Sequence, residues 1–202
     1  MSRGGTYTQA DGAGAAFGTS IWGINASGQL ALTYAPSSNQ LAHRWTPLGG
    51  GSYAVADLSI PGSLGTYAGG MNNNGDMVGY FQTPGYGAFL WRADGSLVTF
   101  NHPADGQTTQ ALGINDSGVI VGAYFASHIT GFVLQNGVYT DINYPGQNYT
   151  YATGINNDGT IVGWYLDGRN QAHGFIATEL PEPATFGLTG MLSLVLLWRR
   201  RR

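Results

Sequence analysis

The residues best placed to hold a ligand recur along the chain in asparagine-rich loops. Each loop has an asparagine after a Gly-Ile or Gly-Met pair and a glycine three positions later, and the four asparagines are Asn25, Asn72, Asn115 and Asn156. A calcium site needs about six to eight oxygen ligands, several of them carboxylates. Each loop carries at most one aspartate, at changing offsets: Asp76, Asp116 and Asp158. We therefore interpret the loops as metal-free turns, in which asparagine bonds its own backbone and glycine adopts a positive φ.

Histidine and carboxylate side chains supply no recognisable catalytic pattern. The four histidines are His43, His102, His128 and His173, and no two of them lie at metal-ligand spacing within one element. A fold can still bring residues from distant segments together, so spacing alone does not exclude a composite site. No serine stands in a Gly-x-Ser-x-Gly turn, and no pair of acids is placed distinctively for glycoside hydrolysis. Several acids fall at expected turns or strand ends, where water solvates them: Asp57, Asp94, Asp105, Asp141 and Asp167. We predict that the protein is not an enzyme and has no catalytic, cofactor-binding or metal-binding residue; a hydrolase with a composite site is the second alternative.

Aromatic residues divide between expected strands and expected loops. Those that recur with the strands are interpreted as core: Tyr34, Phe89, Trp91, Phe132, Trp164 and Phe175. Tyrosines in loops are expected to reach solvent: Tyr86, Tyr144, Tyr149 and Tyr151. Exposed rings beside amides and carboxylates are typical of sugar binding, because apolar sugar faces stack on rings while hydroxyls form hydrogen bonds. A glycan-binding, lectin-like module is therefore the first alternative function.

These groups belong to an internal repeat, which predicts the fold. The Gly-Ile-Asn-x-x-Gly loop recurs at intervals of 47, 43 and 41 residues, and its copies begin at Gly23, Gly70, Gly113 and Gly154. An Ile-Val-Gly strand or a variant of it, a short aromatic strand and a β-rich stretch ending near a proline share this period. Four short strands in about 42 residues, separated by turn residues, form the unit of a β-propeller blade. The predicted fold is all-β, a β-propeller-like array of about four four-stranded repeats.

The last repeat lacks its fourth strand, and the N-terminus offers a substitute. The segment Gly5-Thr6-Tyr7-Thr8-Gln9 matches the fourth-strand segment at 137–141. A strand over residues 5–10 is therefore expected to complete the last blade. Closure by strand exchange would leave few exposed sheet edges. The alternative is a fragment of a longer array with an upstream export signal.

Charge and composition exclude some functions and argue against others. The chain contains no cysteine, which excludes disulfides and thiolate chemistry, and its eight basic residues are all arginine. Residues 1–180 carry four arginines against ten acids, a net charge of −6, which argues against the basic face that nucleic acid requires. Only 9% of residues are charged, while 33 are glycine and 12 are tyrosine. Such a surface suits a secreted β-protein.

The C-terminal segment has three parts in a fixed order. Pro181, Glu182 and Pro183 precede an apolar run over 184–198, and the basic residues Arg199, Arg200, Arg201 and Arg202 end the chain. As a helix, the apolar run would span about 22 Å, short of the roughly 30 Å hydrocarbon core. Arginine side chains reach back to headgroups, and the positive-inside rule places them in the cytoplasm with the body outside. A plain membrane tail or a docked helix is the alternative.

This segment resembles the PEP-CTERM sorting signal of bacterial envelope proteins, which an exosortase-type membrane enzyme processes. The resemblance implies that Pro181, Glu182 and Pro183 are the recognition element and that the four terminal arginines are the cytoplasmic stop. Over residues 20–178 the repeats resemble the HAF family of extracellular repeats, through Gly-Ile-Asn-x-x-Gly, Ile-Val-Gly and Gly-Ala-Phe. Gly87 stands where that family has its histidine. HAF repeats imply a propeller-like extracellular domain without defined chemistry.

Two regions are therefore expected, a repeat domain over 1–178 and a sorting and anchor segment over 179–202 with a hydrophobic helix. The resemblances imply a non-enzymatic protein of a Gram-negative bacterium that is exported and held transiently in the inner membrane. It would then lie at the cell surface or outside the cell, associated with exopolysaccharide or biofilm. The expected partners are an exosortase-type enzyme, the membrane and exopolysaccharide. No nucleic acid and no cofactor are expected.

Overall fold

The computed structural model describes residues 9–12, 15, 18–36, 39–104 and 108–178, which form fifteen strands and no helix. The strands are β1 (Thr19–Ile24), β2 (Leu30–Tyr34), β3 (Leu41–Gly49), β4 (Ser52–Leu58), β5 (Gly65–Met71), β6 (Met77–Gln82), β7 (Tyr86–Trp91), β8 (Leu97–Phe100), β9 (Gln110–Ile114), β10 (Ile120–Phe125), β11 (Ile129–Gln135), β12 (Val138–Ile142), β13 (Tyr149–Ile155), β14 (Ile161–Leu166) and β15 (Ala172–Ala177).

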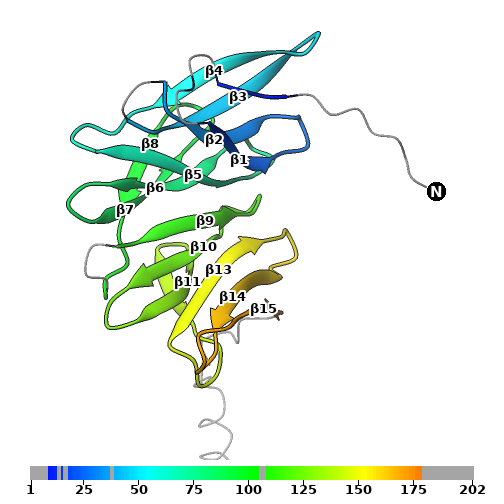
Figure 1. The fold of residues 1–202 in the computed structure, drawn as a ribbon. Coiled ribbons are helices and arrows are strands. Elements are labelled where there is room, and N and C mark those ends of the chain that lie inside the picture. Colours follow the sequence, from blue (N-terminus) through cyan, green and yellow to red (C-terminus); the bar gives the residue numbers. More distant parts are fainter. Residues whose placement is uncertain (1–8, 13–14, 16–17, 37–38, 105–107, 179–202) are drawn as a thin grey trace, which may run out of the picture.

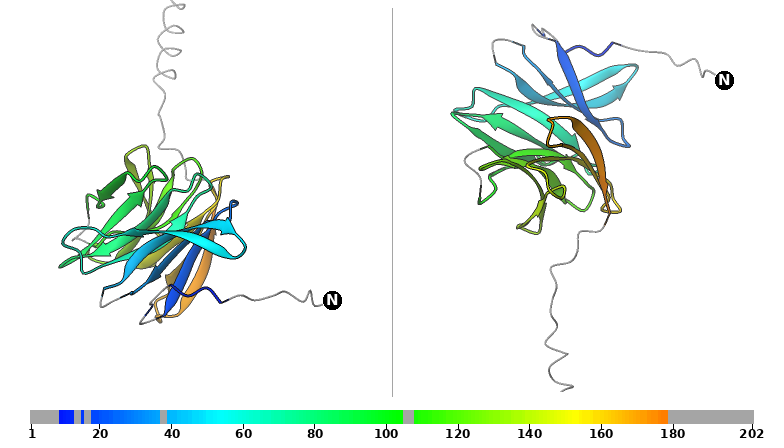
Figure 2. Two further views of the ribbon diagram at one scale, coloured as in Figure 1. Left: turned by 90° about the horizontal axis from the view of Figure 1, so that it is seen from above. Right: turned by 60° about the horizontal axis from the view of Figure 1, so that its bottom comes forward.

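Consecutive strands pair antiparallel within four blades (Figure 1). Blade 1 is β1–β4, blade 2 is β5–β8, blade 3 is β9–β12 and blade 4 is β13–β15. A single parallel register contact between Ile129 and Tyr149 joins blades 3 and 4 into one seven-stranded sheet. In the right-hand view of Figure 2 the blades follow one another in an arc, from the blue first blade through the green blades to the orange last blade. The predicted all-β, propeller-like array of four repeats is confirmed.

The hydrophobic core lies between blades, because successive side chains of a strand point to opposite faces of its sheet. In β6, Met77 packs toward blade 1, whereas its neighbour Val78 packs toward blade 3. The same alternation places Ile120 of β10 against blade 2 and Val121 against blade 4. Each fully buried side chain of this size contributes about 1.5–3 kcal/mol relative to exposure. The repeat is therefore stable only as part of an array.

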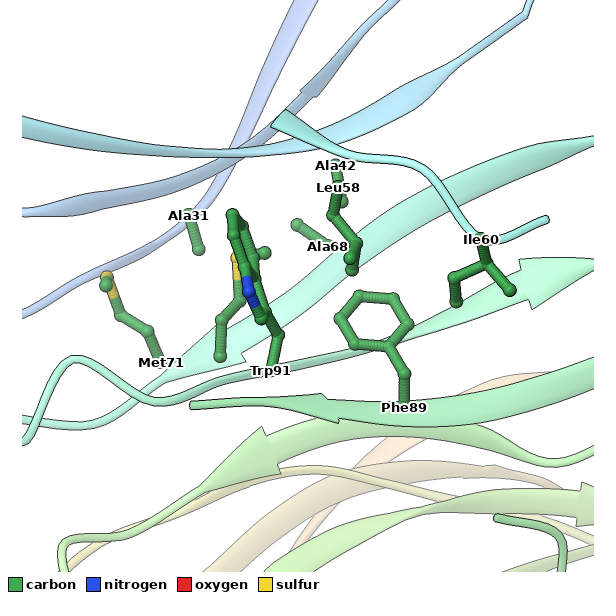
Figure 3. Packing of buried hydrophobic residues seen from close by; sticks show 9 residues of the cluster. Ala31, Ala42, Leu58, Ile60, Ala68, Met71, Phe89 and Trp91 are labelled. Carbon is green, nitrogen blue, oxygen red and sulfur yellow. The ribbon is translucent and has the colours of Figure 1, made fainter. Parts of the chain in front are cut away.

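Figure 3 shows the interface between blades 1 and 2. Phe89 and Trp91 of blade 2 lie among small side chains of blade 1, including Ala31 and Ala42. Leu58 and Ile60 close the same cluster from the end of blade 1. Bulky rings on one blade therefore fit against alanines on the next, which gives close packing without voids.

The glycine of the Ile-Val-Gly strand has a packing role in three blades. It pairs across the sheet with a phenylalanine in each, as Gly79–Phe89, Gly122–Phe132 and Gly163–Phe175. A Cβ atom at Gly122 would lie 2.0 Å from the Gln110 carbonyl oxygen and 2.9 Å from the Phe132 ring. The ring lies over the glycine, so a larger residue cannot replace it without moving backbone. Blade 1 has Leu32 opposite His43 at this place.

The C-terminal helix and the six-residue N-terminal strand fall largely outside the described residues. Residues 179–202, with the predicted sorting motif and arginines, lie beyond the described part of the chain. Of the strand predicted over 5–10, only Gln9 and Ala10 are described, outside any strand, and Ala10 packs against the core of blade 1. Within the described ranges no helix is long and apolar enough to cross a membrane.

Candidate functional site

The innermost strands β1, β5, β9 and β13 lie side by side, and a hollow that all four blades line is found at each of two places along them. At the end where these strands stop, a hollow of about 220 Å³ is lined by the Gly-Ile-Asn loops of all four blades. Farther back along the strands, a second hollow of about 200 Å³ is again lined by residues of all four blades, Trp22 and Tyr80 among them. The first end is built from the repeated positions, and the second from positions where the repeats differ.

At the first end, each asparagine side-chain oxygen accepts hydrogen bonds from its own turn. Asn115 Oδ1 accepts from the backbone N–H groups of Ser117 at 3.1 Å and Val119 at 3.0 Å. Asn156 Oδ1 does the same for Asp158 and Thr160. The prediction that these asparagines are turn residues is confirmed.

The amide nitrogens of the same asparagines connect successive blades. Each donates to the backbone carbonyl oxygen of the next asparagine along the array, at 3.1–3.2 Å; the three bonds are Asn25 to Asn72, Asn72 to Asn115 and Asn115 to Asn156. We call these four residues and the residue after each of them the asparagine ladder. One side chain thus fixes both its turn and the neighbouring blade, a role that sequence patterns alone did not reveal.

A second row of the ladder runs through the residues after the asparagines. The N–H of Ala26 donates to Asn73 Oδ1, that of Asn73 to Asp116 Oδ1, and that of Asp116 to Asn157 Oδ1, at 2.8–2.9 Å. The side-chain amides of Asn73 and Asn157 also donate to Asp116 Oδ2. Hydrogen bonds from Asn73 and then Asn157 lower the pKa of Asp116 below its usual value, against a smaller opposing effect of desolvation. The polar groups of this end therefore bond one another and form a structural element.

The second end is organised by pairs of residues that face each other across the first two strands of every blade. The pair lies at the same place in each repeat, and the four pairs are Ser20–Thr33, Tyr67–Tyr80, Gln110–Ala123 and Tyr151–Trp164. Blades 2 and 4 thus carry aromatic pairs. Blade 3, between them, carries an amide and a methyl group.

The aromatic pairs are stacked platforms. The ring centroids of Tyr67 and Tyr80 lie 4.9 Å apart, and those of Tyr151 and Trp164 lie 4.2 Å apart. Tyr86 meets Tyr80 edge to face at 5.8 Å. Burial raises the pKa of Tyr80 and of Tyr151, and the neighbouring phenols Tyr67 and Tyr86 raise that of Tyr80 further. These phenols remain neutral hydrogen-bond donors near pH 7.

A hollow opens over blade 3 because Ala123 has no ring to fill it. This hollow, of about 170 Å³, has Tyr86 of blade 2 and Tyr151 of blade 4 in its lining, together with Gln110 and Ala123. Gln110 also lines the 200 Å³ hollow with Trp22, Tyr80 and Thr153. We call the two hollows, which share Gln110, the aromatic cavity.

Trp22 distinguishes the aromatic cavity from an ordinary packing defect. Its side chain is 60% exposed, although tryptophan is the largest apolar residue available to a core. No carboxylate or histidine lines either hollow among the described residues. The cavity therefore offers ring faces, phenol hydroxyls, two threonine side chains and one carboxamide, which suit an uncharged polyhydroxylated ligand.

Sequence reasoning identified only part of this cavity. Tyr86 and Tyr151, expected in loops, do line it, although both lie in strands; Tyr144 and Tyr149 are partly exposed elsewhere. Trp164, expected in the core, is instead only partly buried and stacks on Tyr151. The other aromatic residues expected in the core do lie there. Phe175 is partly buried, and four are buried: Tyr34, Phe89, Trp91 and Phe132. Sequence analysis missed Trp22 and Gln110. For Gln110, the signal was that the third repeat lacks the aromatic pair that the repeats on either side of it carry.

The histidines form three separate pairs with aspartates. His43 Nδ1 lies 2.7 Å from Asp57, His102 Nε2 lies 3.3 Å from Asp141, and His173 Nε2 lies 3.2 Å from Asp167; the fourth histidine, His128, contacts Ser127. His43 and His102 are buried and stack on tyrosine rings, Tyr34 and Tyr124. Among the described residues no group of three or more metal-binding side chains occurs. The pairs belong to different blades and do not converge on one site.

Comparisons with known proteins give a fold-level likeness only. No family model and no curated protein matches the chain. Similar solved structures include a streptogramin B lyase, at 12% identity, and virginiamycin B lyase from Staphylococcus aureus, at 16% identity, each with a TM-score of 0.45. Each match covers 79% of this chain and 55% of the lyase, so this chain spans about half the length of those proteins. Likenesses this weak assign no chemistry.

Proposed function

We propose that this chain is an exported, non-enzymatic cell-envelope protein whose aromatic cavity binds a saccharide chain of the surrounding exopolysaccharide. The observation that carries the proposal is the cavity over blade 3, between Tyr86 and Tyr151, with Gln110 shared by both of its hollows. Apolar sugar faces would stack on the rings, and sugar hydroxyls would bond the carboxamide and the phenols.

The size of the aromatic cavity favours a short stretch of a longer chain. Its hollows measure about 200 Å³ and 170 Å³. Sites that enclose a drug-sized ligand usually hold roughly 300–1,000 Å³. One or two sugar units would therefore occupy the cavity while the rest of the polymer crosses the surface, a geometry that suits attachment to a matrix.

The lining also supports binding without turnover. Glycoside hydrolysis by the usual route needs two carboxyl groups facing the scissile bond. The described lining of the aromatic cavity contains none. The three histidine–aspartate pairs are separate, and two of the histidines are buried against tyrosine rings.

Export and sorting are proposed from the C-terminal segment. Its Pro181-Glu182-Pro183 element, apolar run and terminal arginines would serve an exosortase-type enzyme after transient anchoring in the inner membrane of a Gram-negative bacterium. The low charge content of 9% suits a protein that works outside the cell within a hydrated polymer.

Calorimetric titration of the full chain with oligosaccharides from the producing organism's exopolysaccharide tests the binding proposal. Binding is expected, and Trp22→Ala should weaken it at least tenfold, which is about 1.4 kcal/mol. Leu48→Ala removes an equally exposed apolar side chain outside the cavity lining and should leave the affinity unchanged. Equal affinity of both variants would contradict the site, and release of new reducing ends would show an enzyme instead.

Intact-mass spectrometry of the protein from its native envelope and medium tests the sorting proposal. A mass that lacks the residues after the Pro181–Pro183 element supports processing. A mass that retains all four terminal arginines would mean that the protein keeps its anchor, and the sorting proposal would fail.

A further inference from the structure

A fourth hollow lies between blades 3 and 4, beside the asparagine ladder. It measures about 310 Å³ and is the largest of the hollows described here. Val119, Val133 and Ile161 form its apolar part, while Gln135, Asp158 and Gly159 bring polar groups to it. The asparagine ladder and the aromatic cavity leave this space unexplained.

The equivalent space between blades 1 and 2 is filled by an arginine of the protein itself. Arg44 of β3 is only 9% exposed and reaches into blade 2, where its Nη1 donates to the carbonyl oxygens of Gly75 and Arg92, each at 3.0 Å. Its guanidinium carbon lies 4.3 Å from the ring centroid of Trp91. Burial lowers the pKa of Arg44, while the charges of Asp76 and Asp94 oppose that shift.

Strand register shows that the two spaces correspond. Arg44 pairs with Ala31 on the neighbouring strand, and Val133 pairs with Val121 at the same place in blade 3. On the facing blade, Trp91 pairs with Met77, and its counterpart Ala177 pairs with Ile161. Blade 3 therefore lacks the arginine, and blade 4 lacks the ring. The 310 Å³ hollow is the space that these two side chains would occupy.

The acceptor for a guanidinium is retained in blade 4. Gly159 corresponds to Gly75, and the two turns share the same conformation, with φ of 82° and 85°. Each glycine N–H also donates to the carbonyl oxygen of its ladder asparagine at 3.2 Å, Gly159 to Asn156 and Gly75 to Asn72. Gly159, which lines the hollow, therefore offers a carbonyl oxygen from the turn position that binds Arg44 in blade 2.

Blade 4 also keeps a carboxylate in this turn, at a different position. Asp158 lines the hollow and takes the place of Asn74, whereas Thr160 takes the place of Asp76, whose charge acts on Arg44 in blade 2. Asp158 is exposed at the edge of the hollow, where its carboxylate can form a charge-assisted hydrogen bond with a cation. The chain thus keeps the glycine acceptor of the arginine site, adds a carboxylate beside it and omits the arginine.

We propose that the hollow between blades 3 and 4 binds a guanidinium group on an extended alkyl stem, either a free molecule or an arginine side chain of a partner. The guanidinium would bond the Gly159 carbonyl oxygen and the Asp158 carboxylate, with Gln135 beside it. The stem would lie along Val119 and Val133. This site is separate from the aromatic cavity and does not depend on saccharide binding.

A titration of the full chain with matched small molecules tests the site. The probe is N-acetyl-L-arginine methylamide, and its control is the citrulline analogue, which has the same shape without the charge. We expect the arginine compound to bind at least tenfold more tightly than the citrulline compound. A second titration uses free L-arginine, which represents a small-molecule ligand. It carries charged amino and carboxyl groups that an arginine residue within a protein chain lacks. Equal binding of the arginine and citrulline compounds, or no binding of either, would overturn the proposal.

Two variants locate the binding. Val133→Arg places the missing arginine within the chain, as in blade 1, and should abolish binding of the probe while raising Tm. Asp158→Asn keeps the fold and should weaken the probe at least tenfold, whereas Asp167→Asn, at the other end of β14, should not. If Val133→Arg does not fold, the comparison of Asp158→Asn with Asp167→Asn alone tests the site. Unchanged affinity in Asp158→Asn would contradict the site, and saccharide affinity should be the same in all folded variants.

Discussion

The asparagine ladder and the aromatic cavity use the repeat in opposite ways. In the ladder the same residue stands at the same place in every blade, as Asn25, Asn72, Asn115 and Asn156, and the amides of the first three bond the next blade. In the aromatic cavity the corresponding positions differ between blades, from Tyr67–Tyr80 and Tyr151–Trp164 to Gln110–Ala123.

This difference separates structure from binding in a repeat protein. A position that is the same in every blade satisfies a requirement that every blade shares, such as a turn or an interface. A position at which one blade departs from its neighbours creates a feature that occurs once, and a ligand site needs such a feature. At the place of Val133 the blade that departs is blade 1, which has Arg44 where blades 2 and 4 have the aliphatic residues Leu90 and Ile176. The hollow between blades 3 and 4 depends on the absence of that arginine and on Ala177, which lacks the ring of Trp91.

The strongest test of the repeated positions is Gly122→Ala. The added Cβ would lie 2.0 Å from the backbone oxygen of Gln110, which cannot move without breaking the β9–β10 pairing. We expect a loss of about 3 kcal/mol or more in the free energy of unfolding, or failure to fold. The control is Gly168→Ala, where nothing lies within 4 Å and the stability should be nearly unchanged. Urea denaturation measures both, and equal stability of the two variants would refute the packing role.

Removal of one ladder side chain should cause the next largest loss in the free energy of unfolding. Asn115→Ala removes two acceptor bonds within its turn and one donor bond to the Asn156 carbonyl oxygen, all at a buried position. Each such bond is worth about 1 kcal/mol, so we expect a loss of about 3 kcal/mol. Asn148→Ala, at an exposed position, should change stability by less than about 0.5 kcal/mol. Saccharide affinity of the folded Asn115→Ala protein should remain at the wild-type value.

Making blade 3 resemble blade 2 tests the non-repeated positions. Ala123→Tyr places a phenol where Tyr80 stands in blade 2, so the ring would fill the hollow between Tyr86 and Tyr151. We expect at least a tenfold loss of saccharide affinity, about 1.4 kcal/mol. Thermal unfolding of the same sample shows whether the fold persists. Full affinity in a folded Ala123→Tyr protein would place the ligand elsewhere.

The smallest effect concerns the charge in the ladder. The pKa of Asp116 is lowered in the folded protein, so its carboxylate stabilises the fold above the unfolded-state pKa of about 3.9, and this contribution is lost as the pH falls through the folded-state value. Asp116→Asn should therefore have a slightly lower Tm than wild type at pH 7, and the gap should close as the pH falls through the lowered pKa of Asp116. Asp94 and Asp167 also have lowered pKa values, so the Tm of wild type and that of Asp116→Asn both fall as the pH is lowered. Only the difference between the two Tm values measures the contribution of Asp116. A gap that is independent of pH would contradict this assignment.

Much of the fold could be predicted because it depends on residues that recur. The period of the Gly-Ile-Asn loops, the turn glycines and the four strands per repeat predicted a propeller-like array, and the structure confirms it. The pairing of Gly122 with Phe132 explains why glycine ends the Ile-Val-Gly strand, although sequence alone showed only that it recurs.

The candidate site could not be predicted in the same way. Gln110 and Ala123 are far from Trp22 in the chain and are ordinary residues singly; their importance follows from the rings of blades 2 and 4 on either side. The connection of blades by the ladder also depends on spatial neighbours, since Asn25 donates to a residue 47 positions away. A comparison of the four repeats position by position would have pointed to Gln110 and to Arg44, which stands where the other repeats have Leu90, Val133 and Ile176.

A ¹H–¹⁵N spectrum of the tryptophan indoles during titration of the full chain with the exopolysaccharide oligosaccharides reports directly on the aromatic cavity. The chain has five tryptophans, of which Trp22 is 60% exposed in the cavity lining, whereas Trp45 and Trp91 are each 7% exposed in the cores of blades 1 and 2. We predict that the Trp22 signal shifts most and that the Trp164 signal shifts less, while the signals of Trp45 and Trp91 do not move. Saturable shifts confined to Trp45 and Trp91, or no shift at Trp22 while the saccharide binds, would contradict a saccharide site in the aromatic cavity.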